Sequence, residues 1–439
     1  MKRAIALCGG GTKGAYELGA WKALRELGIS YQIVTGTSIG AINGALMAAG
    51  DFEQACELWD TIEMENVMAD GLNLTTTIEG MYNQREAIRP FLKKYVKNKG
   101  ADISPFIEFI DRTVDEERVR ASGRDYGLVT VQVTPIKPLE LTLNEIPQGK
   151  LKDFIMASAS VFPVFPMQKI DGVTYLDGCY YDNLPVDLAL KMGAEEVIAV
   201  DLHTSPSHPN YVNKPYVTYI TPSRPLGTIL NFDRKVLDDN VRLGYYDTMK
   251  AFGRMAGKSC CFYTEELGDW DKAIWNYSAR VAAAEACLTE GTFKRFVKPG
   301  SGRHLCGSIE EHIGRKTGSY TREDYFLGGA EICSEIFQIP EETPWGLKAF
   351  IREIQGKIKE PEFYTDRDSF GKKPGNERIS DRNVAKSRAD RSFLTGCIYY
   401  GYKQRMPGLE EQLNLLMFHP GELAAALFLL AVEETDNPV

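Results

Sequence analysis

The sequence of 439 residues predicts an α/β fold in which helices cover a mainly parallel sheet, followed by a mainly helical C-terminal region. Two observations lead to this prediction. Apolar runs typical of buried strands alternate with helical patterns to about residue 202, and strand patterns fade beyond about residue 256. A chain this long exceeds a typical single core, so we expect two domains, residues 1–255 and 256–439.

The first 50 residues have a β-α-β-α pattern. Residues 3–8 (RAIALC) are an apolar run that ends at three glycines, which is typical of a buried strand. After Gly14, apolar residues recur every three positions and predict a helix that ends at Gly28. A second strand over residues 31–36 and a helix of small residues over 39–49 follow. This alternation is characteristic of a parallel sheet covered by helices.

The rest of the first domain mixes both kinds of element. Residues 52–125 have mostly helical patterns, and residues 206–228 are rich in prolines and polar residues and predict a long loop. We predict further strands over residues 126–134, 139–144, 173–178 and 195–202, and further helices over residues 149–159 and 232–246. All the strands that we predict therefore lie in the first domain.

Charge and cysteine content exclude several classes of protein. The net charge of −9 argues against non-specific binding of nucleic acid. The nine cysteines are irregularly spaced, which indicates neither a disulfide framework nor a zinc site. The apolar run at the start has about five residues, fewer than the roughly 7–15 of a signal peptide. We therefore expect a reduced, cytoplasmic protein.

Two segments of the second domain bear on membrane contact. Residues 423–432 (LAAALFLLAV) form the longest apolar run, far shorter than the roughly 20 residues that span a bilayer. We interpret this run as a packed core helix, with lipid docking or a lid over the active site as alternatives. Residues 371–392 hold seven basic and three acidic residues, which favours a charged linker over a site for anionic headgroups. Peripheral contact with a membrane stays open.

Two glycine-containing motifs follow the first two strands. Residues 36–40 (GTSIG) fit Gly-x-Ser-x-Gly, the sharp strand-to-helix turn that exposes a serine nucleophile, here Ser38. Residues 9–14 (GGGTKG) also fit the dinucleotide-binding pattern Gly-x-Gly-x-x-Gly. That pattern requires an acidic residue after the second strand to bind ribose, and none occurs between Glu26 and Asp51. A nucleotide-dependent oxidoreductase is therefore the weaker hypothesis.

The first motif could instead stabilise negative charge. Without a Cβ atom, Gly9, Gly10 and Gly11 can turn their backbone N–H groups toward a ligand, and a helix N-terminus adds partial positive charge. The carboxyl ends of neighbouring parallel strands meet at one edge, so we expect these groups near Ser38. They would then form an oxyanion hole for a carbonyl attacked by the serine. The alternative is a tight turn without chemistry.

A serine nucleophile needs a base within hydrogen-bond distance. The first 200 residues contain no histidine, and His203 is the best histidine candidate, although an ordinary loop histidine fits the sequence better. Asp177 lies between apolar Leu176 and Gly178 at the end of a predicted strand. Partial desolvation there would raise the proton affinity of the carboxylate toward that of a useful base. A plain hairpin turn is the alternative.

Taken together, these motifs resemble the patatin-like phospholipase family. The resemblance covers residues 3 to about 200, with residues 157–166 (ASASVFPVFP) and 183–185 (NLP) on either side of the Asp-Gly pair. It implies a three-layer sandwich and a Ser–Asp dyad, with Ser38 as nucleophile, Asp177 as base and the glycines of residues 9–11 as oxyanion hole. This chain departs from the family pattern at three positions: Cys8 stands where plant patatins carry Asp, and Cys179 and Asp182 stand where relatives often have Gly and Asn.

The resemblance implies a catalytic domain over residues 1–255 that hydrolyses carboxylic esters of lipids through an acyl-enzyme, without a metal or cofactor. The expected partner is a lipid or phospholipid substrate. Lys13, in the glycine motif, could contact a lipid phosphate, although a solvated lysine is commoner at a helix start. A catalytically silent lipid-binding or storage protein on the same scaffold is the alternative. The sequence assigns no role to residues 256–439.

Overall fold

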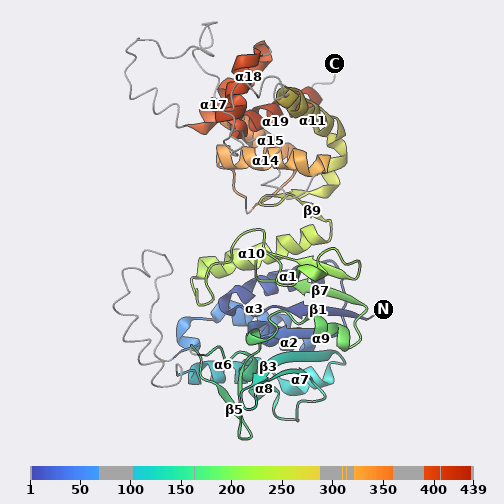
Figure 1. Ribbon diagram of the computed structural model, residues 1–439, viewed down its shortest axis with the longest axis vertical. Coiled ribbons are helices and arrows are strands. Elements are labelled where there is room, and N and C mark those ends of the chain that lie inside the picture. Colours follow the sequence, from blue (N-terminus) through green and yellow to red (C-terminus); the bar gives the residue numbers. More distant parts are fainter. Residues whose placement is uncertain are drawn as a thin grey trace, which may run out of the picture. The chain divides into compact units, whose positions relative to one another are not determined.

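The computed structural model describes residues 2–68, 102–162, 164–286, 309, 313, 321–341, 343–358, 390–405 and 407–436. The chain divides into two compact units, Met1–Phe252 and Gly253–Val439, which we call the N-terminal and C-terminal units (Figure 1). Each unit has its own hydrophobic core.

The N-terminal unit is built on one eight-stranded sheet. Its order is β5-β6-β3-β2-β1-β7-β8, and β4 pairs with β3 outside this path. The strands are β1 (Arg3–Leu7), β2 (Ile33–Thr37), β3 (Asp125–Gln132), β4 (Lys137–Thr142), β5 (Gln168–Ile170), β6 (Val173–Asp177), β7 (Glu196–Val200) and β8 (Val217–Ile220). The five strands from β3 to β8 along this order pair in parallel, whereas β4, β5 and β6 pair antiparallel. This sheet confirms the predicted α/β fold class.

Helices cover both faces of the sheet. They are α1 (Ala15–Glu26), α2 (Ile39–Ala49), α3 (Phe52–Thr61), α6 (Ser104–Thr113), α7 (Glu116–Ala121), α8 (Leu151–Ser158), α9 (Val186–Lys191) and α10 (Arg234–Ala251). Val34 of β2 lies against α2 at Gly44, and the hydroxyl of the adjacent Thr35 donates to the carbonyl of Pro185 at the start of α9. Since successive strand residues point to opposite faces, α2 and α9 pack on opposite sides, giving three layers.

Several elements differ from the sequence prediction. Strand β8 lies within residues 206–228, which we predicted as a loop, and β5 was not predicted. Both are short, with three or four residues, and pair at the two edges of the sheet, where little of the strand must be apolar. Within residues 52–125, α3, α6 and α7 are helical as expected, but residues 69–101 lie outside the described part.

The C-terminal unit is mainly helical, as predicted. Its helices are α11 (Asp271–Glu285), α14 (Arg322–Phe337), α15 (Leu347–Lys357), α17 (Arg391–Gln404), α18 (Leu409–Phe418) and α19 (Pro420–Asp436). It also contains a small sheet of β9 (Met255–Ala256), β10 (Cys261–Tyr263) and β11 (Pro344–Trp345), which the sequence analysis missed. These strands have two or three residues, too few to produce a periodic pattern.

Helix α19 is the centre of the C-terminal core. It packs against α11, α14, α17 and α18, and residues 423–432 are buried along its whole circumference. This burial confirms the prediction of a packed core helix. The lid and lipid-docking alternatives are wrong, because no apolar face of these residues is left for a ligand. Most of the basic segment at residues 371–392 lies outside the described residues. In the part of the chain that the structure describes, no helix is both long and apolar enough to cross a membrane.

The burial of α19 predicts a large stability effect. Phe428, with 0% of its surface exposed, contacts Tyr277 and Phe326, so Phe428→Ala should lower the free energy of unfolding of the C-terminal unit by about 3–5 kcal/mol. Urea unfolding followed by circular dichroism would measure the change. Phe418→Ala is the matched control, because Phe418 is 67% exposed and its loss should cost less than about 0.5 kcal/mol. Equal effects of the two variants would contradict a core role for α19.

Candidate active site

Ser38 occupies a strained turn between β2 and α2. Its backbone has φ 56° and ψ −123°, outside the regions that non-glycine residues favour. A Cβ atom on Gly40 would lie 2.6 Å from the carbonyl oxygen of Leu7, so only glycine permits this approach of helix to strand. The Ser38 N–H donates to the Ser158 hydroxyl at 3.0 Å, which in turn donates to the Val129 carbonyl at 2.7 Å. The turn thus presents the side chain of Ser38 at the carboxyl end of β2.

Asp177 reaches the same region from β6. Strand register pairs Asp177 with Thr130 of β3, and the preceding residue of β3, Val129, pairs with Thr37 of β2, next to Ser38. The predicted strand end at Asp177 is therefore present, and the two predicted site residues come together from opposite sides of β3.

The carboxyl group of Asp177 is almost completely buried, with 1% exposed. Its Oδ1 accepts a hydrogen bond of 2.8 Å from the Cys179 N–H, whereas Oδ2 has no hydrogen-bond partner among the described residues. Burial raises the pKa of Asp177 to about 6, although the Cys179 N–H and the neighbouring hydroxyl of Ser38 oppose the shift. The carboxyl group is therefore basic enough to accept a proton and still ionised near neutral pH.

The glycine motif lies beside Ser38, but its three glycines differ. A Cβ atom on Gly9 would lie 3.1 Å from the Cβ of Ser38, which shows how close the loop approaches. The N–H of Gly9 donates to the Asn183 carbonyl at 2.9 Å, so the expectation that Gly9 supplies an oxyanion donor needs correction. The N–H groups of Gly10 and Gly11 have no acceptor among the described residues. These two groups remain as the donors that the loop can offer.

These groups share a cavity of about 240 Å³. Ser38, Asp177 and the three glycines of the loop line it together with Lys13 and His203. Its remaining wall is largely apolar and includes Ile42, Trp59, Ile62, Phe106, Phe165 and Phe232. An uncharged, elongated group such as an acyl chain fits this lining, because no charged side chain other than those at the polar end would need to be desolvated.

A second cavity, of about 480 Å³, adjoins the first. Lys13 and His203 line both cavities, so the two meet at these side chains. The second cavity is lined by the hydroxyl-bearing side chains of Thr204, Ser205 and Ser207, and no carboxylate is among its lining residues. One cation, several hydroxyl donors and the absence of acid in this lining suit an anionic group.

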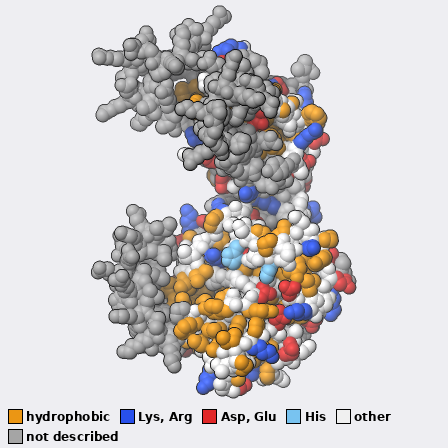
Figure 2. Space-filling view, viewed as in Figure 1, with side chains coloured by type: hydrophobic (Ala, Val, Ile, Leu, Met, Phe, Trp, Pro, Cys, Tyr) orange, Lys and Arg blue, Asp and Glu red, His pale blue; other side chains and the backbone are white. Residues whose placement is uncertain are grey.

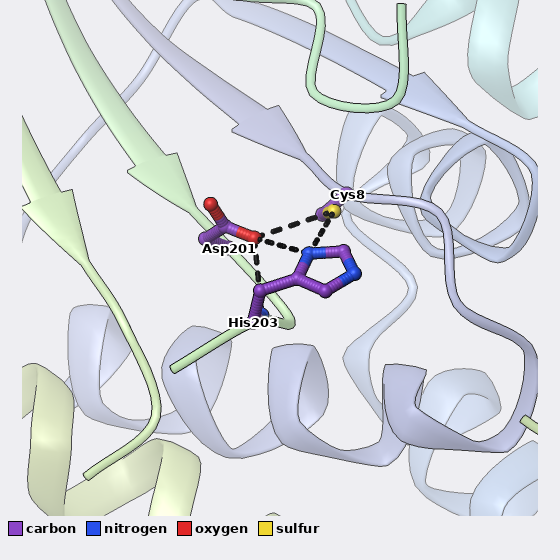
Figure 3. A group of neighbouring side chains, drawn as sticks. All are labelled: Cys8, Asp201 and His203. Atoms are coloured by element: carbon purple, nitrogen blue, oxygen red, sulfur yellow. Dashed lines mark hydrogen bonds and ion pairs between the residues drawn. The ribbon is translucent and has the colours of Figure 1, made fainter. Parts of the chain in front are cut away.

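His203 is bonded to a buried carboxylate rather than to Ser38. Its Nδ1 lies 2.9 Å from Oδ1 of Asp201, at the end of β7 (Figure 3). Although burial opposes it, hydrogen bonds from Ser207, Tyr219 and His203 hold the pKa of Asp201 below its usual value. The third member of this group is Cys8, whose pKa is raised well above its usual value by burial and by the charge of Asp201. Among the described residues, these three could bring their donor atoms to one metal ion.

Three supporting residues carry no motif signal of their own. Ser158 fixes the backbone of Ser38, and Asn183 donates from Nδ2 to the carbonyl of Gly9 at 2.9 Å. Cys179 supplies the N–H that binds Asp177. Ser158 and Asn183 lie in the two segments that flank the Asp-Gly pair and resemble the family. The sequence therefore pointed to these segments, but it did not show which contacts the two residues make. Asp182, the third departure from the family pattern, binds Nε2 of His208 at 2.9 Å.

One family model matches part of the N-terminal unit. The family model described as patatin-like phospholipase matches residues 5–190. Patatin-like phospholipase domain-containing protein 6 of Homo sapiens is 30% identical over 205 residues, which are 45% of this chain and 13% of that protein. Lysophospholipase nte1 of Aspergillus niger is 27% identical over 203 residues, which are 45% of this chain and 12% of that protein. The chain thus spans a small part of these relatives.

Among solved structures, VipD from Legionella pneumophila aligns with 97% of this chain and 91% of its own, at 14% identity and a TM-score of 0.39. A likeness at this level supports no conclusion about the chain.

Because it is buried, the ionised carboxyl group of Asp177 should destabilise the folded protein. Because its folded pKa of about 6 exceeds the usual 3.8, the folded state holds the proton more tightly, and stability falls as pH rises between these values. Asp177→Asn should therefore be more stable than the natural protein above pH 6, by up to about 3 kcal/mol, with the difference vanishing below about pH 4. Urea unfolding at several pH values would measure this. Asp60→Asn, at an exposed position, is the control, and a destabilised Asp177→Asn at pH 7 would contradict the prediction.

Proposed function

Residues 5–190 match the family model of patatin-like phospholipases, and from this premise we propose that the N-terminal unit is a serine acyl hydrolase of lipid carboxylic esters. The proposed activity is of the phospholipase A, lysophospholipase or esterase type. One observation carries the proposal: the strained Ser38 and the buried Asp177, with its pKa of about 6, line one largely apolar cavity. A nucleophile, a base and room for an acyl chain are the parts that ester hydrolysis requires.

In the first step, Oγ of Ser38 attacks the ester carbonyl while its proton passes to Oδ2 of Asp177, the oxygen without a hydrogen-bond partner. The N–H groups of Gly10 and Gly11 stabilise the oxyanion of the tetrahedral intermediate. The carbon–oxygen bond to the alcohol then breaks, and Asp177 returns the proton to the leaving oxygen. The Ser38 hydroxyl already lies close enough to the Asp177 carboxyl group to lower its pKa, and transfer of this proton requires such closeness.

In the second step, water replaces the alcohol. Asp177 accepts a proton from the water molecule, whose oxygen attacks the acyl carbonyl held on Ser38. Collapse of the second tetrahedral intermediate breaks the acyl–serine bond, and the proton on Asp177 passes to Oγ. The fatty acid leaves and both side chains regain their starting states. A single carboxyl group serves both steps because its raised pKa lets it gain and lose a proton near neutral pH.

The two adjoining cavities support a lipid or phospholipid substrate. The acyl chain occupies the apolar cavity, and Lys13, at the junction, contacts a phosphate in the second one. Ile229 lines the apolar cavity and is exposed, and Tyr180 and Tyr181, just after Asp177, are exposed as well. Hydrophobic side chains also gather over α6 and β5 on the face drawn in Figure 2. These features support peripheral contact with a lipid surface.

The alternative is a silent lipid-binding protein on the same scaffold. The observation that favours it is the largely apolar cavity, which would hold an acyl chain whether or not Ser38 reacts. The two hypotheses differ in whether the serine reacts, so a covalent serine probe distinguishes them.

We expect a fluorophosphonate probe to add once to the natural protein, not at all to Ser38→Ala, and at least about 100-fold more slowly to Asp177→Asn, because loss of a general base costs about that much. Intact mass spectrometry would follow the adduct. The rate for the natural protein should rise with pH through about 6, as Asp177 loses its proton. His203→Ala is the matched control and should label at nearly the natural rate. Normal labelling of Asp177→Asn with loss in His203→Ala would transfer the role of base to His203.

Lys13→Ala should change substrate preference. We expect the ratio of kcat/KM for a lysophospholipid to kcat/KM for a monoacylglycerol with the same acyl chain to fall about 10-fold, because the phosphate loses a charged hydrogen-bond donor. Lys214→Ala, which removes an exposed lysine elsewhere in the unit, should leave this ratio unchanged. An unchanged ratio for Lys13→Ala would contradict the phosphate contact.

A further inference from the structure

Three different metal-ligand side chains meet beneath the glycine motif. Cys8 follows β1, whereas Asp201 and His203 follow β7, the neighbouring parallel strand, so residues almost 200 positions apart lie at one sheet edge (Figure 3). The Sγ of Cys8 is 3.6 Å from Oδ1 of Asp201 and 3.9 Å from Nδ1 of His203, and Oδ1 and Nδ1 are 2.9 Å apart. We propose that these three side chains form a binding site for a divalent transition metal, with zinc as the best fit.

The spacing of the three atoms accommodates the ion without moving the backbone. A triangle with these sides has a point about 2 Å from every corner, close to the distances of about 2.0–2.2 Å to nitrogen and oxygen and 2.3 Å to sulfur that zinc adopts. A slight displacement from the plane lengthens all three bonds and opens a fourth position. The Ser207 hydroxyl, 3.0 Å from Oδ1 and 3.1 Å from Nδ1, lies beside that position, which it or a water molecule could fill.

Charge also favours a divalent ion. Cys8 and Asp201 are fully buried side by side, so a thiolate and a carboxylate there would repel each other without a cation between them. A divalent cation balances one thiolate and one carboxylate, leaving a neutral buried site. On binding, the thiol proton leaves to solvent and His203 keeps its single ring proton on Nε2. Cysteine sulfur and imidazole nitrogen select zinc over magnesium or calcium.

Neighbouring residues form hydrogen bonds with the proposed ligands. In known metal sites, such bonds orient the ligands. Oδ2 of Asp201 accepts from the N–H of Ser207 at 2.7 Å and from the hydroxyl of Tyr219 at 2.8 Å, which leaves Oδ1 turned toward Cys8 and His203. The amide Nδ2 of Asn183 donates to Sγ of Cys8 at 3.2 Å, as expected beside a metal-bound thiolate. Such outer partners orient ligands and raise metal affinity.

A metal ion could reach this site from solvent, and its binding would affect the glycine motif. The side chain of His203 is 46% exposed and lines the second cavity, so solvent reaches one ligand directly. Cys8 immediately precedes Gly9, and Asn183 contacts both residues. A metal would therefore tie the ends of β1 and β7 together under the glycine motif and stiffen it. This role does not depend on the proposed hydrolysis.

The test measures metal rather than activity. Full-length protein is stripped with a chelator, and Zn²⁺ is titrated by calorimetry; Co²⁺ is added separately and followed by absorption. We expect one Zn²⁺ per chain and a near-ultraviolet band from cobalt bound to thiolate. Cys8→Ala should abolish the band, and both Cys8→Ala and His203→Ala should weaken Zn²⁺ by more than the roughly 10–100-fold that loss of an outer partner costs.

His208→Ala is the matched control, because His208 lies on the same loop and also pairs with an aspartate, Asp182, at 2.9 Å. It should bind Zn²⁺ as the natural protein does. Absence of the cobalt band in the natural protein would overturn the proposal, whatever the folding of the variants. So would Zn²⁺ binding that survives in Cys8→Ala or is lost in His208→Ala. Fluorophosphonate labelling of the stripped protein reports separately on Ser38, so failure of the metal proposal and failure of the hydrolase proposal are distinguishable.

Discussion

The sharp turn at Ser38 is the constraint on which the candidate site depends. A non-glycine residue with φ 56° costs about 1–3 kcal/mol, and this cost persists only where the surroundings fix the backbone. Here Ser158 binds the N–H of Ser38, and Gly40 lets α2 approach β1. Because the turn ends β2 in the middle of the sheet, loops that follow β1, β6 and β7 can reach the nucleophile.

Burial gives Asp177 its proposed chemical role and also makes it unfavourable for folding. A carboxylate removed from water with one oxygen lacking a partner has a raised pKa, and the same desolvation lowers the stability of the folded state at neutral pH. The packing of β6 on β3 holds the group in place despite this cost. Stability and proposed reactivity therefore have one physical origin, the low polarity around a single side chain.

The polar end of the site is organised by contacts that converge on the ends of β1 and β7. Asn183 contacts Cys8 and Gly9, and Asp201 receives donors from Ser207, Tyr219 and His203. The N–H of Gly9 is used in a hydrogen bond to Asn183, whereas the N–H groups of Gly10 and Gly11 have no acceptor among the residues that the structure describes. The arrangement links the glycine motif to the loop after β7, so that a ligand bound at that loop would affect the motif directly.

The sequence by itself determined the α/β class, the patatin-like resemblance over residues 3 to about 200 and the sharp turn at Ser38, because these depend on local patterns of apolar residues and glycines. Only the tertiary structure decided the different hydrogen bonding of Gly9, the short edge strands β5 and β8, and the meeting of Cys8 with Asp201 and His203. The hydrogen bond of Gly9 and the meeting of Cys8 with Asp201 and His203 depend on contacts between segments far apart in the chain, whereas β5 pairs with β6 across a two-residue turn that the sequence analysis overlooked. Strand pairing sets such contacts, and neither residue spacing nor local propensity records them.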